Sequence, residues 1–341
     1  MITKDLFIRN IEADSYRENF LVSAVVSVFV IRIFLELTNY PQLGGGAFHI
    51  AHMLWGGMFM MAALLILLSF LSQKAASIAS ILGGIGFGAF IDELGKFVTS
   101  DNDYFFQPTI ALIYIIFVLL FLISRFIPRY REISQREYLV NAIEMIKESA
   151  INDFDKEEEK RAAEYLRKCD PKNPIVQALR KVLLELDVVP TPKPNIFTRF
   201  RQMLRVYYYR VAKSGFITNL VIVFLTIQTV WIFATSTLLF VGKPSLPFSE
   251  TGQLYSSILA GAFVLIGLFA LRLSRYEAFR YFQIAMLITI FLTQFFALMR
   301  LQWYEIGALV ANVFILFVIN YTLVRERKKN KSLKQLSTES A

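Results

Sequence analysis

Ionisable side chains gather within and beside the first three apolar stretches of this 341-residue chain. Charged groups are costly inside a membrane, and those that occur there commonly belong to an ion pathway, a proton relay or a ligand site. The residue types present could bind a metal, exchange protons or bind a small ligand. They are Arg32, Glu36, His49, His52, Asp92, Glu93 and Lys96, followed in the next loop by Asp101 and Asp103.

The two histidines suggest metal chemistry. His49 and His52 are three residues apart, so their imidazoles share one face of a helix. Together with Asp92 they form a donor set suited to Zn or Fe, with a coordination position left for water. The candidate catalytic residues are Glu93 as a general base, Asp92, and Lys96 as a partner for either acid. The first hypothesis is therefore a metal-dependent hydrolase that acts on a lipid or a small ester.

Four further residues form the candidate ligand-binding set. Arg32 and Glu36 lie four positions apart in the first apolar stretch, where they share a helix face and can pair with each other. Asp101 and Asp103 occupy the loop after the third stretch. We expect a small molecule or an ion to reach this set from the extracytoplasmic side.

Two other functions use the same residues. In proton- or cation-coupled transport, Asp92, Glu93 and the histidines take up the ion and a nearby basic residue serves as the counter-ion. In a sensor or scaffold, the polar site binds a ligand and a cytoplasmic module passes the signal to a protein partner. For each ion pair taken alone, simple neutralisation of a helix end is an equally good explanation. The gathering of all these residues in the first three stretches favours a functional site.

The composition indicates an integral membrane protein. Hydrophobic residues make up 55% of the chain and charged residues 18%, and the mean hydropathy is +0.50, values atypical of a soluble domain. About eight apolar stretches approach the roughly 20 residues that a membrane-spanning helix needs. We predict an all-α, polytopic fold with four helices on each side of a cytoplasmic helical insertion. The predicted spans are 20–38, 48–71, 75–98, 108–126, 216–240, 254–273, 280–299 and 303–324.

Lys and Arg residues orient the predicted spans. They are concentrated in alternate loops, and short loops rich in positive charge stay in the cytoplasm. This pattern predicts a multi-pass protein of the plasma (inner) membrane with both termini in the cytoplasm and the polar site near the outer face. It also accounts for the net charge of +9, so we expect membrane lipids, and not nucleic acid, as the partner of the basic segments.

The predicted domains follow from this topology. Residues 1–19 form a cytoplasmic segment, 20–126 the first four spans, 127–214 a cytoplasmic module with a linker, 215–324 the last four spans, and 325–341 a basic tail. The periodicity of the module predicts helices at 134–151, 156–168 and 173–186. A basic, aromatic helix at 197–213 would suit the membrane surface. The single Cys169 lies in the module and excludes an intramolecular disulfide.

Small residues predict which helix faces pack together. A stripe on the third stretch ends in Asp92, so this carboxylate is expected to point into the helix bundle. The stripe consists of Gly84, Gly88 and Gly95. On the second stretch, Gly56 and Ala63 continue the face of His52, so the histidines are expected to face protein instead of lipid.

Overall fold

The computed structural model describes residues 8–38, 52–101, 103, 106, 108–126, 132–190, 199, 203, 206, 210, 213–242 and 246–339. These residues are helical, with no strand among them and one isolated bridge between Asp155 and Val189. Six helices are long and apolar enough to cross a membrane, which confirms the all-helical membrane character of the chain. They are Ala13–Leu37, His52–Ser69, Gln73–Ile91, Phe248–Ala270, Arg275–Leu301 and Ile306–Arg327.

The chain forms two compact units. The first comprises Met1–Tyr104 and Leu119–Lys193, and the second comprises Phe105–Val118 and Pro194–Ala341. Helix α5 (Thr109–Phe126) therefore contributes residues to both units. The residues of interest for function lie in the first unit.

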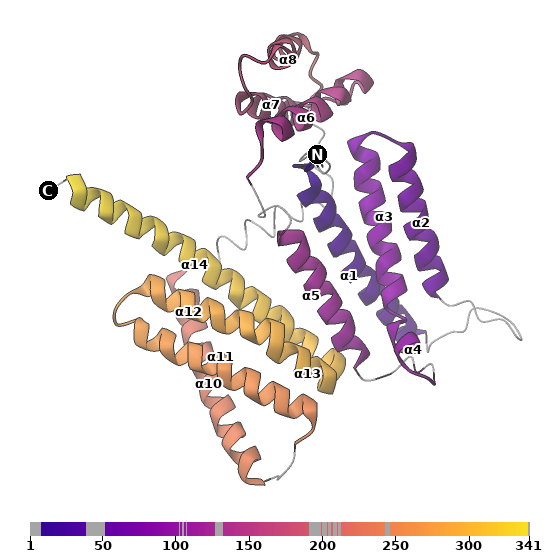
Figure 1. Cartoon of the computed structure of the whole chain (residues 1–341). Helices are drawn as coiled ribbons and strands as arrows, with labels where there is room; N and C mark the ends of the chain where they lie inside the picture. The colour runs from indigo at the N-terminus through magenta and orange to yellow at the C-terminus, as the bar shows by residue number, and fades with distance from the viewer. Residues whose placement is uncertain are drawn as a thin grey trace, which may run out of the picture. The chain divides into compact units, whose positions relative to one another are not determined.

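Helix α3 (Gln73–Ile91) is the centre of the apolar part of the first unit and packs against α1 (Ala13–Leu37) and α2 (His52–Ser69) (Figure 1). Toward α1, the predicted glycine stripe is confirmed at Gly84 and Gly88, whereas Gly95 lies beyond the end of α3 in a second, short helix. A Cβ atom added at Gly84 or Gly88 would collide with the backbone of α1. Glycine at these positions therefore sets the close approach of the two helices.

The contact between α3 and α2 depends on a second pair of glycines. A Cβ atom on Gly56 would lie 2.6 Å from the carbonyl oxygen of Gly86, and one on Gly86 would lie 2.6 Å from the carbonyl oxygen of Gly56. Ala63 is also buried. The face of α2 that continues from His52 is therefore directed toward protein, as predicted.

A break interrupts the third apolar stretch. The sequence predicts one span over 75–98, but α3 ends at Ile91 and a short helix, α4 (Leu94–Val98), begins after a turn. Asp92 and Glu93 form this turn. The break thus lies at two consecutive acidic residues.

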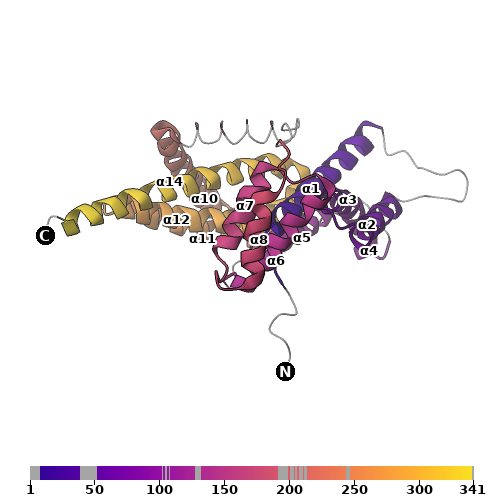
Figure 2. The same ribbon diagram turned by 90° about the horizontal axis from the view of Figure 1, so that it is seen from above.

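The module packs as three helices, α6 (Gln135–Ile146), α7 (Lys156–Arg167) and α8 (Pro174–Glu185), with a 3₁₀ turn, η2 (Lys147–Ile151), after α6. They lie where the periodicity predicts them and group together in both views (Figures 1 and 2). Reciprocal capping by Ser134 and by Asp155 begins the first two, while Asn173 caps the third. Phe154, Leu166, Val176 and other apolar side chains form their shared core.

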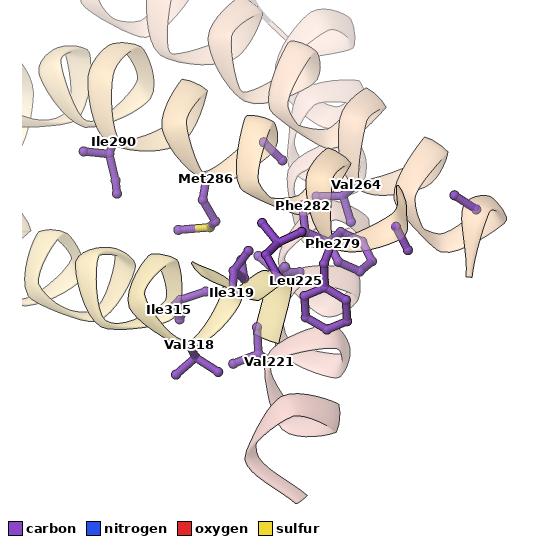
Figure 3. Packing of buried hydrophobic residues seen from close by; sticks show 14 residues of the cluster. Val221, Leu225, Val264, Phe279, Phe282, Met286, Ile290, Ile315, Val318 and Ile319 are labelled. Carbon is purple, nitrogen blue, oxygen red and sulfur yellow. The ribbon is translucent and has the colours of Figure 1, made fainter. Parts of the chain in front are cut away.

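The second unit is a bundle with its own core. Its helices are α10 (Gly215–Gly242), α11 (Phe248–Ala270), α12 (Arg275–Ile288), α13 (Gln294–Leu301) and α14 (Ile306–Glu339), with a π-helical turn, η3 (Thr289–Thr293), and a 3₁₀ turn, η4 (Gln302–Glu305). Phe279, Phe282 and Ile319 lie at the centre of the core (Figure 3).

Two buried polar residues of the second unit link α13 and α14. The Gln294 side chain accepts from Asn312 at 3.2 Å. The Tyr114 hydroxyl donates to the carbonyl of Ile290 within the π-helical turn. Helix α14 continues as helix through most of the predicted basic tail, because Lys, Arg and Glu are good helix formers.

Candidate functional site

Five of the predicted side chains meet in the first unit, where α1, α2 and the turn between α3 and α4 come together. We call Arg32, His52, Asp92, Glu93 and Lys96 the ion-pair cluster. Arg32 reaches from α1 to Asp92, with 2.5 Å between Nε and Oδ1, and its Nη2 donates to the Asp92 backbone carbonyl at 3.0 Å. One guanidinium thus holds both the side chain and the backbone of the helix break.

His52 joins the two carboxylates. Its Nε2 lies 3.1 Å from Oδ2 of Asp92, and its Nδ1 lies 3.1 Å from Oε1 of Glu93. Lys96 closes the other end of the cluster, with Nζ 3.1 Å from the same Glu93 oxygen. The predicted pairing of Lys96 with one of the two acids is therefore confirmed, and its partner is Glu93.

The carboxylates are covered more completely than their partners. The side chain of Asp92 is 0% exposed and that of Glu93 is 2% exposed. Arg32, His52 and Lys96 keep 11%, 23% and 25% of their side-chain surface exposed. A buried charge without a partner is strongly destabilising, so the three bases are what make the burial of two acids tolerable. His52 and Lys96 are the more accessible members of the cluster.

The His52 ring lies where it can bridge the two carboxylates. An ionised carboxylate can only accept a hydrogen bond, whereas a neutral imidazole has one N–H and one bare nitrogen. A doubly protonated imidazole in this position could donate to an oxygen of each carboxylate, 3.1 Å from each ring nitrogen.

The remaining predicted residues do not all join the cluster. Glu36 is exposed on α1, and the predicted pairing of Arg32 with it is replaced by the contact with Asp92. Asp101 is exposed in the turn after α4. The backbone N–H of Asp103 donates to the Thr99 hydroxyl at 2.7 Å.

Only part of the predicted metal-binding set lies among the described residues. His49 lies outside the described residues, so the combination of His49, His52 and Asp92 stays a prediction. Among the described residues, no group of three or more His, Cys, Asp or Glu side chains is arranged to hold a metal ion. Both nitrogens of His52 face carboxylates, so coordination through this ring would require those contacts to change.

Comparisons with protein-family models, with curated proteins and with solved structures each find no match.

Proposed function

We propose that this chain is a plasma-membrane protein that binds a proton at the ion-pair cluster and couples its uptake to the movement of an ion or small solute. The observation that supports this proposal is the position of His52 between two buried carboxylates, with an oxygen 3.1 Å from each ring nitrogen. A doubly protonated imidazole could donate to both oxygens, whereas a neutral one could donate to only one of them. Buried networks of acids and histidines are the usual proton relays of pumps and transporters.

The proposal includes a membrane topology with eight spans. Eight spans result if α5 and α10 cross the membrane together with the six longer helices, and their apolar segments Thr109–Ser124 and Gly215–Trp231 support this count. The distribution of Lys and Arg then puts both termini and the α6–α8 module in the cytoplasm. The cluster would lie near the outer face, where a proton and a solute could enter.

The charge balance explains how proton binding could drive movement. Among the five side chains, two cations and two ionised carboxylates cancel, so a proton bound by the imidazole would give the group a net charge of +1. Electrostatic interactions are strong in a poorly solvated environment, so gain or loss of this charge changes the energy of a nearby ion substantially. A solute ion and the proton would therefore influence each other's binding.

Proton movement in liposomes tests the proposal. The full-length protein is reconstituted into vesicles that contain a fluorescent pH indicator, the membrane potential is clamped with K⁺ and an ionophore, and a pH gradient is imposed. We expect the wild-type protein to collapse the gradient faster when Na⁺, K⁺ or a mixture of amino acids is added. Asp92→Asn and His52→Gln should reduce this rate to that of protein-free vesicles, because each removes one side of the proton-holding contact.

The matched control is Asp187→Asn, which makes the same chemical change at an exposed carboxylate after α8. This variant should move protons at the wild-type rate. Normal solute-dependent proton movement by a correctly folded Asp92→Asn protein would contradict the proposal.

Metal analysis separates this proposal from the metal-dependent hydrolase. Elemental analysis of purified protein after dialysis against a weak chelator should show no stoichiometric metal, because His52 directs both ring nitrogens to carboxylates. Near-stoichiometric Zn or Fe that is lost in the His49→Ala/His52→Ala protein would instead establish a metal centre. Assays of lipid and ester hydrolysis would then replace the transport assays.

A further inference from the structure

Two helices connect the ion-pair cluster to the α6–α8 module. Helix α1 carries Arg32 near its C-terminal end, and helix α3 ends immediately before Asp92. Within the first unit, the module lies at the opposite end of these helices from α4 (Figure 1). The other ends of α1 and α3 are the ends that contact the module.

Before α1, the chain binds the module through a set of buried polar contacts. The guanidinium of Arg9 pairs with Glu137, with 3.0 Å between Nε and Oε1, and the Asn141 side chain accepts from the Ile11 N–H at 2.8 Å. Asn141 also donates to the Arg9 carbonyl at 2.8 Å. Glu137 and Asn141 are both buried, so the N-terminal segment is held by specific hydrogen bonds.

The N-cap residue of α1 is held directly by α7. Glu12 accepts from Arg161 at 2.8 Å and from the Tyr165 hydroxyl at 3.0 Å. Both donors come from one face of α7. A shift of the start of α1 would therefore break two hydrogen bonds to a carboxylate.

The module also holds the start of α3. The backbone N–H of Gln73, at the first position of α3, donates to the buried carboxylate of Glu148 at 3.1 Å. A carboxylate at a helix N-terminus is stabilised by the free N–H groups and the helix dipole. Lys74 pairs with Asp153 at 2.6 Å, and Lys147 donates to the Leu71 carbonyl at 2.6 Å. The module thus contacts both helices that carry the buried acid and its arginine.

Between their ends, α1 and α3 are packed too closely to move independently. The glycine stripe of α3 lies against the backbone of α1, and the Ser27 hydroxyl donates to the Ile85 carbonyl at 3.0 Å. Closely packed helices move between discrete arrangements and do not deform continuously. We infer that α1 and α3 couple the ion-pair cluster to the docking of the α6–α8 module, so that the module regulates the cluster and responds to it.

The chain contains a natural reporter of opening of the module core, to which the docking residue Tyr165 also belongs. Cys169 is its only cysteine and is 4% exposed in the module core, where its thiol donates to the Tyr165 carbonyl at 3.3 Å. Tyr165 is also the residue that binds Glu12. Burial raises the pKa of the Cys169 thiol, which further slows its reaction with alkylating agents. Alkylation of Cys169 therefore requires the module to open.

The test measures the rate at which N-ethylmaleimide labels Cys169 in the full-length, detergent-purified protein at fixed pH. If docking is coupled to the cluster, Asp92→Asn should increase the rate at least about fivefold, the lower range of ordinary coupling between sites. Lys96→Gln, which changes a more exposed member of the cluster, should increase it in the same direction. Arg161→Ala, which breaks the contact with Glu12 itself, is the positive control.

Three features of the design keep the test decisive. Thermal unfolding of each sample shows whether Asp92→Asn has unfolded, and labelling well below each midpoint reports local opening. Lys96→Gln gives an independent answer if Asp92→Asn does not fold. Asp187→Asn makes the same change at an exposed site of the module. Equal rates in the wild type, Lys96→Gln and folded Asp92→Asn, while Arg161→Ala labels faster, would overturn the inference, as would an equal increase in Asp187→Asn.

This inference rests on the proposed function for the identity of the bound ion, but the two can fail separately. Labelling is measured without a pH gradient or a solute, so it does not depend on transport. Faster labelling of the cluster variants together with absent proton flux would leave the coupling standing and point to a membrane sensor. Proton flux together with unchanged labelling would retain the transporter and reject the coupling.

Discussion

Asp92→Asn is expected to lower the free energy of unfolding by about 3–5 kcal/mol, the usual cost of leaving a buried charge without its partner. Asp92 is fully buried and uses both carboxylate oxygens, one toward Arg32 and one toward His52. Asparagine has one carbonyl oxygen, so its amide NH₂ would face one of these bases. Unfolding in mixed detergent and SDS micelles, followed by circular dichroism, measures the difference.

Two further variants show that the effect comes from this contact. Glu36→Gln changes an exposed carboxylate on the same helix as Arg32 and should alter stability by less than about 0.5 kcal/mol. In a double-mutant cycle, Arg32→Met combined with Asp92→Asn should cost less than the sum of the two single changes, by about 0.5–3 kcal/mol. Additive effects would mean that the two side chains do not stabilise each other.

The second large effect is expected from adding one methyl group to α2. Gly56→Ala would bring a Cβ atom within 2.6 Å of the Gly86 carbonyl oxygen and 2.7 Å of the Phe90 backbone nitrogen. Backbone atoms cannot rotate away, so α2 and α3 must separate. We expect a loss of about 1–3 kcal/mol, typical of overpacking.

The neighbouring glycine provides the control for this prediction. A Cβ atom on Gly57 would meet nothing within 4 Å. Gly57→Ala should therefore be neutral or slightly stabilising, because alanine has the higher helix propensity. The same unfolding measurement compares the two variants. If Gly56→Ala were as stable as Gly57→Ala, the close packing of α2 on α3 would be wrong.

The members of the ion-pair cluster could be predicted because membrane segments contain few charged residues. Asp92 was recognisable as a buried acid from the glycine stripe that precedes it, since small residues mark the face that packs against another helix. The spacing of Asp92, Glu93 and Lys96 predicted that the lysine pairs with one of the two acids. The glycine stripe and the spacing of the acids and the lysine each involve residues that are close together in the sequence.

The partner of Arg32 could not be predicted in this way. Spacing favoured Glu36 because residues four apart lie on one helix face. Arg32 instead pairs with the buried Asp92, because an exposed carboxylate is already solvated by water whereas a buried one needs a cation. The break at Asp92 and Glu93 was missed for a related reason. Its contacts come from two other helices, and neither acid belongs to a motif that ends a helix.

The contact of the α6–α8 module with the N-terminal segment and α1 could not be predicted from the sequence either. The periodicity of α6, α7 and α8 predicts their apolar faces, but the residues that hold α1 are polar. Glu137 and Asn141 could be assigned to a solvated face on hydrophobicity alone, yet both are buried against the N-terminal segment. The available signal was a pair of polar residues at positions of an amphipathic helix that face the core. This signal does not identify their partner, which lies 128 positions away in the sequence.

The distance along the chain between paired residues has a consequence for biosynthesis. Arg32 is separated from Asp92 by 60 positions, and Arg9 from Glu137 by 128. The ribosome therefore delivers the arginine of α1 to the insertion machinery well before its carboxylate exists. The ion pair between Arg32 and Asp92 can therefore form only after α3 has been made, and the contact between the N-terminal segment and the module forms later still.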